Sequence, residues 1–224
     1  MKAALKDVGL QILGGLHEED TTLFLIGPDG PRFWHKLQTT PEFQDGLPDP
    51  IDRYSERALG AIATSYKAEA LFPFGGPPYH PFFKWAVESK RCFASPAVLL
   101  VHAEHGLFAS FRGALRIKGI HPLPSTAPNP CLSCIEKPCL SACPAGAIEK
   151  ENYNVAACHV FLDSEKGADC MARGCAVRRA CPVGQALRPE GQSAFHMRYF
   201  HKGALNETTD PDTPRQIELV KRCR

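Results

Sequence analysis

The sequence predicts an α+β protein in which an N-terminal α/β sheet domain precedes a cysteine-rich domain. Three observations lead to this prediction. In the N-terminal half, apolar residues recur at helical spacing in some segments and form short strand-like runs in others. Eight of the ten cysteines lie between residues 131 and 181, where large apolar side chains are few. Four prolines within nine residues, from Pro122 to Pro130, mark the boundary between the two parts.

The first elements are predicted from apolar spacing. A first helix is expected over the apolar residues Leu5, Val8, Ile12, Leu13 and Leu16. A short buried strand is expected over 21–26, closed by the turn residues 27–30. The opening segment has no cleavage site and no apolar run is long enough to cross a membrane, so we expect a cytoplasmic protein without a membrane span.

A second helix is predicted to begin after Asp49, with Pro50 as its first residue and Asp52 in its first turn. Another apolar and aromatic stretch covers 81–87. The segments 98–102 and 107–117, separated by a turn at 104–106, predict a β-hairpin.

We therefore expect a domain over 1–121, a proline-rich linker over 122–130 and a cysteine-rich domain over 131–224. The aromatic run 195–201 predicts a C-terminal helix that packs on a domain. With 224 residues and 44% hydrophobic residues, the chain can form a substantial core. A net charge of +2 gives no reason to expect a nucleic-acid partner.

The cysteines form two groups that each end in Cys-Pro. The first group is Cys131, Cys134, Cys139 and Cys143, and the second is Cys158, Cys170, Cys175 and Cys181. Eight thiolates are the number that two [4Fe-4S] clusters need, and bacterial ferredoxins send the fourth cysteine of a C-x2-C-x2-C-x3-C-P run to the other cluster. The spacings here are looser, because four residues separate Cys134 from Cys139. Thiolate sites without an open position favour electron transfer, so we expect an electron-carrying protein, with oxidoreductase the favoured enzyme class.

Two other uses of cysteine are weighed against clusters. Structural zinc usually takes paired C-x2-C knuckles, and here only Cys131 and Cys134 form such a pair. Disulfides require an oxidising compartment, and no secretory signal is present. Cys92 is expected to be a small core residue, and Cys223 an exposed one.

The stretch from Cys131 to Leu187 resembles the two-cluster ferredoxin domain of epoxyqueuosine reductases and reductive dehalogenases. The resemblance is carried by Cys131-Leu132-Ser133-Cys134, by residues 142–148 and by residues 157–162. It implies a bacterial-ferredoxin-like fold. It also implies one cluster on Cys131, Cys134, Cys139 and Cys181, and the other on Cys143, Cys158, Cys170 and Cys175.

The N-terminal part resembles CblC-type cobalamin-processing proteins, which have a nitroreductase-like fold. The residues concerned are 49–52, the loop 74–76, and His102, Gly106, Phe108 and Arg112. This resemblance implies that cobalamin or another corrinoid binds against a wall bearing His102, Phe108 and Arg112.

Two functions follow as expectations. In one, two clusters pass electrons to a corrinoid held by the N-terminal domain. In the other, the chain is a ferredoxin-type carrier or subunit whose N-terminal domain only docks a partner. Both require a soluble electron donor or acceptor protein, and Arg173, Arg178 and Arg179 are candidates for docking it or for tuning a cluster.

Overall fold

The computed structural model describes residues 1–148 and 152–206 of the chain. It is a mixture of helix and sheet, which confirms the α+β class at that level. The chain forms two compact units: unit 1 comprises Met1–Cys92 and Ala109–Pro128, and unit 2 comprises Phe93–Phe108 and the chain from Asn129 onward.

This division differs from the predicted ranges 1–121, 122–130 and 131–224, because the segment 93–108 belongs with the cysteine-rich part. The proline-rich segment is also not a free linker. The Arg91 Nη1 donates to the Ser125 carbonyl at 2.8 Å, and the Ala127 N–H donates to the Lys90 carbonyl at 3.1 Å. These hydrogen bonds fix residues 122–128 to unit 1.

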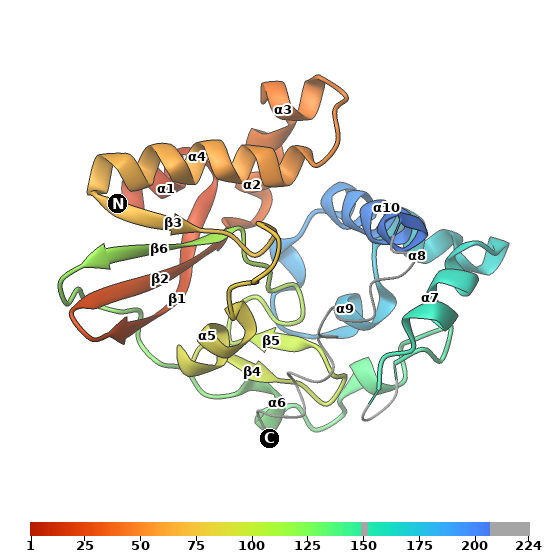
Figure 1. Cartoon of the computed structure of the whole chain (residues 1–224). Helices are drawn as coiled ribbons and strands as arrows, with labels where there is room; N and C mark the ends of the chain where they lie inside the picture. Colours follow the sequence, from red (N-terminus) through yellow and green to blue (C-terminus); the bar gives the residue numbers. More distant parts are fainter. Residues whose placement is uncertain (149–151, 207–224) are drawn as a thin grey trace. The chain divides into compact units, whose positions relative to one another are not determined.

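Unit 1 is built on an antiparallel sheet with the strand order β1-β2-β6-β3 (Figure 1). The strands are β1 (Leu10–Glu18), β2 (Thr21–Pro28), β3 (Ala68–Leu71) and β6 (Gly113–Lys118). In β2, Phe24 pairs with Leu115 and Leu25 with Ala114. Successive residues of a strand face opposite sides of the sheet, and both Phe24 and Leu25 are buried, so both faces of the sheet are covered.

The helices of unit 1 are α1 (Lys2–Asp7), α2 (Gly30–Gln38), α3 (Pro41–Gln44), α4 (Pro50–Tyr66) and α5 (Phe82–Glu88). The predicted start of α4 is confirmed, with Asp49 at the N-cap and Pro50 in the first turn. Helix α4 contacts β3 and β6. The Tyr54 hydroxyl on its buried face donates to the Val8 carbonyl at 2.7 Å, which joins α4 to the end of α1.

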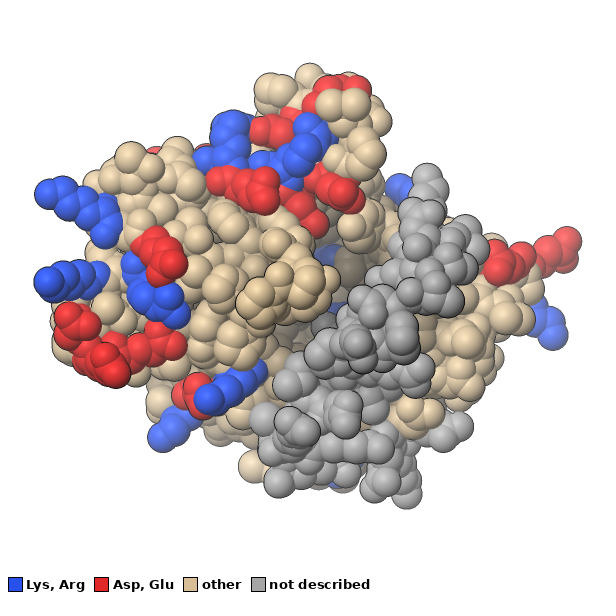
Figure 2. All heavy atoms as spheres, viewed as in Figure 1, with Lys and Arg blue, Asp and Glu red and all other residues tan. Residues whose placement is uncertain are grey.

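Acidic and basic side chains are interspersed over α3 and α4 (Figure 2). Arg53 pairs with Asp45 at 2.7 Å, and Arg57 pairs with Glu42. The charges on this face therefore largely neutralise one another, which is typical of a solvated surface rather than of a nucleic-acid interface.

Two predicted elements of unit 1 are wrong. The first helix ends at Asp7, and residues 10–18 form β1 instead of continuing it. Gly9 has a φ of +72°, which ends the helix, and a Cβ at Gly15 would lie 2.9 Å from the Leu23 carbonyl oxygen. The predicted hairpin is also absent, because β6 pairs with β2 and β3, whereas β5 (Leu100–His102) pairs with β4 (Cys92–Ala94).

In the part that the structure describes, unit 2 contains most of the β4-β5 pair, seven short helices and the longer α10, joined by loops. The helices are α6 (Pro130–Ser133), η1 (Pro138–Leu140), α7 (Val155–Leu162), η2 (Glu165–Gly167), α8 (Ala168–Arg173), α9 (Ala176–Ala180), η3 (Gln185–Leu187) and α10 (Glu190–Asn206). The predicted C-terminal helix is confirmed as part of α10, where Met197 packs with Leu162 and Cys170.

Candidate metal centres

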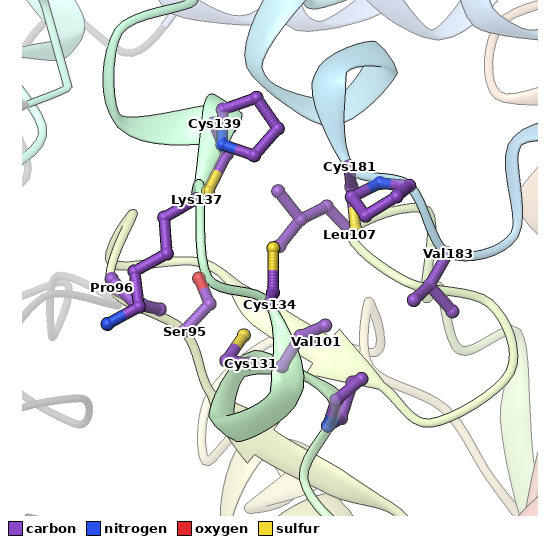
Figure 3. A pocket seen from close by; sticks show the side chains of 13 residues that line it. Ser95, Pro96, Val101, Leu107, Cys131, Cys134, Lys137, Cys139, Cys181 and Val183 are labelled. Atoms are coloured by element: carbon purple, nitrogen blue, oxygen red, sulfur yellow. The ribbon is translucent and has the colours of Figure 1, made fainter.

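Four cysteines of unit 2 surround one small cavity (Figure 3). They are Cys131, Cys134, Cys139 and Cys181. Helix α6 presents the first two, and its start is fixed by the Asn129 side chain, which accepts a hydrogen bond from the Cys131 N–H at 2.9 Å. Cys139 comes from η1 and Cys181 from the end of α9. We call these four residues the first sulfur set.

The other four cysteines surround a second cavity in the same unit. They are Cys143, Cys158, Cys170 and Cys175, which we call the second sulfur set. The loop after η1 supplies Cys143, helices α7 and α8 supply Cys158 and Cys170, and Cys175 is the N-cap of α9. The two cavities have the same volume of about 20 Å³, which exceeds the space one ordered water needs.

The two sets exchange one cysteine each. By sequence, Cys143 ends the first group and Cys181 ends the second, yet each lies with the other group's sulfurs. This grouping is the one that the resemblance to two-cluster proteins implies. The structure shows all eight cysteines as free thiols, without disulfide bonds.

Hydrogen bonds reach the sulfurs of the second set. The Ala147 N–H donates to the Cys143 Sγ at 3.3 Å. The Tyr153 hydroxyl is hydrogen-bonded to the Cys158 sulfur. The backbone of Ala176 is hydrogen-bonded to the Cys170 sulfur. Such donors stabilise negative charge on sulfur, which is the charge that metal-bound thiolates carry.

Burial governs the protonation of these thiols. It raises the pKa of Cys131 to about 11, and it also raises the pKa values of Cys139, Cys158 and Cys170 above the ordinary thiol range. Without metal the four side chains are therefore neutral thiols at pH 7. Because metals bind thiolates, loading of these sites must release protons.

The segment 93–108 supplies a wall of the first cavity that sequence reasoning missed. Val101 and Leu107 pack with Cys139 and Cys181 in one apolar cluster. The turn that follows β5 is held by two hydrogen bonds between His102 and Gly106, each of 2.9 Å. The apolar run 98–101 was a visible signal for a buried element, but its pattern does not say which unit buries it.

The structure places the three residues of the predicted wall in two different units. His102 is fully buried in unit 2, where its Nδ1 accepts hydrogen bonds from the N–H groups of Glu104 and His105 at 3.0 and 3.1 Å. Arg112 belongs to unit 1, where its Nη1 lies 3.2 Å from the Asp52 carboxylate. The predicted hairpin that would have joined them is absent, and the corrinoid wall itself stays a prediction.

Phe108 instead lines a third cavity of unit 2, with a volume of about 260 Å³. This cavity adjoins the second sulfur set, since Cys175 and Tyr153 also line it. Its cationic lining residues are Arg178 and Arg188. The Arg188 guanidinium lies 5.9 Å from the Phe108 ring centroid, over the ring face. Arg178, which donates to the Leu107 carbonyl, is thus the predicted docking arginine that faces a cavity.

The remaining arginine and cysteine predictions, and a histidine beside a ligand cysteine, have the following surroundings. Arg173 and Arg179 both pair with Asp169. His159, which follows a cysteine, has its Nδ1 3.1 Å from that of His201 on α10. Cys92 is buried as predicted, and burial raises its pKa to about 12. Cys223 lies outside the described residues.

Within residues 1–148 and 152–206, no helix combines the length and apolar character that a membrane crossing requires. Comparison of the sequence with models of known protein families and with curated proteins found no match.

Proposed function

We propose that the chain is an iron–sulfur redox protein whose eight cysteines hold two [4Fe-4S] clusters and pass electrons to an acceptor. One observation carries the proposal: the eight sulfurs fall into two sets of four around two cavities, with Cys143 and Cys181 exchanged. Exchange of the fourth cysteine is the ligand topology of two-cluster ferredoxins. It supports a ferredoxin-like description of the cysteine-bearing part of unit 2.

Structural zinc is the alternative occupant. Four sulfurs on one zinc ion all lie about 2.3 Å from it. In the part of the chain that the structure describes, no three His, Cys, Asp or Glu side chains are grouped so that they could hold a single metal ion. The exchange of the fourth cysteine between the two sets is what favours clusters over zinc.

Metal analysis of anaerobically purified protein tests the proposal. We expect about eight irons and eight sulfides per chain, with the broad thiolate-to-iron absorption of such clusters. Zinc at about one or two per chain without sulfide would refute the cluster proposal.

For the acceptor, we propose a corrinoid, with unit 1 as its nitroreductase-like, CblC-like carrier. The cavity beside the second sulfur set is suited to bind a polar or anionic group. Arg178 and Arg188 line it, and the Phe108 ring offers a flat apolar face. Its 260 Å³ is below the roughly 300–1,000 Å³ of complete ligand pockets. This cavity would therefore receive only the edge of such a molecule.

Anaerobic titration with cobalamin tests this part separately. We expect saturable binding and reduction of the added cobalamin by dithionite-reduced protein, followed by absorption and cobalt EPR. Arg188→Ala should weaken the binding, whereas Arg173→Ala, which removes an arginine paired with Asp169 and Glu190, should not. Intact clusters with no spectral change on addition of cobalamin would leave the ferredoxin-type carrier as the function.

A further inference from the structure

Ser95 occupies a fixed position beside the first sulfur set. It follows β4, and its N–H donates to the Leu99 carbonyl at 3.0 Å while its carbonyl accepts from the Val98 N–H at 3.2 Å. Only 3% of the surface of Ser95 is exposed to solvent. The backbone on both sides of the side chain is thus held, and the side chain lies in the interior of unit 2.

The Ser95 hydroxyl is aimed at the sulfurs. Ser95 lines the same cavity as the four cysteines of the first set, and its oxygen is turned toward them in Figure 3. Within the described residues, the Ser95 Oγ is buried and has no hydrogen-bond partner. A buried polar group without a partner costs about 1–3 kcal/mol, so its place in this cavity calls for an acceptor.

The chemistry of the cavity identifies that acceptor. Around the cysteines the wall includes the aliphatic side chains of Val101, Leu107 and Val183, which accept no hydrogen bond. Sulfur is then the acceptor within the cavity itself. The second sulfur set offers a parallel, since there the Tyr153 hydroxyl is hydrogen-bonded to Cys158. Each sulfur set therefore has one hydroxyl side chain beside it.

We infer that the Ser95 hydroxyl donates an O–H···S hydrogen bond to the cluster held by the first sulfur set and raises the reduction potential of that cluster. The inference rests on the proposed function. Reduction adds one negative charge to the cluster, and a fixed donor stabilises the more negative state more strongly. Ser95 would thus act through its hydrogen bond, which stabilises the reduced cluster, and its hydroxyl proton would not be transferred.

The test is a potentiometric EPR titration of the full chain, wild type against Ser95→Ala. Iron and sulfide are counted first. We expect Ser95→Ala to keep the wild-type iron content and to shift the reduction equilibrium of one cluster about tenfold toward the oxidised form, which is ~59 mV for a one-electron couple. The other cluster should titrate as in wild type.

Matched variants separate the hydrogen bond from packing. Ser95→Thr keeps the hydroxyl and Ser95→Val replaces it by a methyl group in a side chain of nearly the same shape, so only the valine variant should lower the potential. Ser89→Ala removes another buried serine, whose hydroxyl donates to the Ala86 carbonyl in unit 1, and should leave both potentials unchanged.

The outcomes distinguish the two proposals. Wild-type protein without iron and sulfide overturns the proposed function. Wild-type protein with both clusters, combined with equal potentials in the threonine and valine variants, overturns the role of Ser95 alone. If Ser95→Ala fails to incorporate the cluster, the threonine and valine variants still decide the question.

Discussion

Replacing Gly106 by alanine should selectively disrupt the first sulfur set. Gly106 has a φ of +54°, which costs an L-residue about 1–2 kcal/mol. A Cβ there would also overlap the Val183 carbonyl oxygen, and it would lie 2.9 Å from the Val183 carbonyl carbon and 3.0 Å from the Cys181 Sγ. Overpacking of this kind adds about 1–3 kcal/mol. We expect a total destabilisation of about 2–5 kcal/mol.

The damage should be local, because the new methyl group pushes against the residue that carries one ligand. Ligand positions must be held to within about 0.5 Å, so a displaced Cys181 should release the first cluster while the second remains. The measurement is iron and sulfide content together with EPR of the reduced protein. We expect iron to fall to about half, from about eight to about four per chain.

Gly146→Ala is the matched control. Gly146 lies in the same unit with a similar φ of +61°, but a Cβ there would meet nothing within 4 Å among the residues that the structure describes. This variant should lose only the backbone term of about 1–2 kcal/mol and keep both clusters. If Gly106→Ala kept full iron and the stability of Gly146→Ala, the close approach of the two loops would not be what holds Cys181 in place.

Three further outcomes are expected. Cys181→Ala should remove about half the iron and broaden the EPR signal of the remaining cluster, since helix α9 carries ligands of both sets; full iron content would contradict its role as a ligand. Tyr153→Phe should keep all iron and lower the potential of the second cluster alone, because a donor to Cys158 is lost; an unchanged potential in EPR titration would count against that hydrogen bond. The pKa of Cys131 is raised to about 11, so the neutral thiol is favoured in folded, metal-free protein. Its contribution to stability is therefore present below the ordinary thiol pKa of 9.0 and is lost as pH rises through about 11. Denaturant unfolding of metal-free protein at several pH values checks this, and a free energy of unfolding that rises over that range would refute it.

Local signals in the sequence were sufficient where an element is defined by its own residues. The Asp49-Pro50 start of α4 and the apolar run of β2 are both present as predicted. The grouping of the cysteines was implied by the resemblance to two-cluster ferredoxin domains, whereas the spacings by themselves left the pairing open.

Partner choice between segments could not be predicted in the same way. The turn between His102 and Gly106 exists, yet β5 pairs with β4 while β6 pairs with β2 and β3. Apolar alternation shows that a strand buries one face, but it does not identify the neighbour that covers it. The prediction of a hairpin over 98–117 failed for this reason, and Ser95 was missed because a lone serine beside a proline has no pattern of its own.

Helix α9 begins after Cys175 and ends before Cys181, so one helical turn and a half joins a ligand of the second set to a ligand of the first. At a rise of about 1.5 Å per residue, these two Cα atoms are separated by about 9 Å along the helix axis. The hydrogen-bonded backbone of α9 thus acts as a spacer of fixed length. In the proposed function, this short helix is one of two segments that fix the distance over which an electron moves between the two clusters, the other being the chain from Cys139 to Cys143.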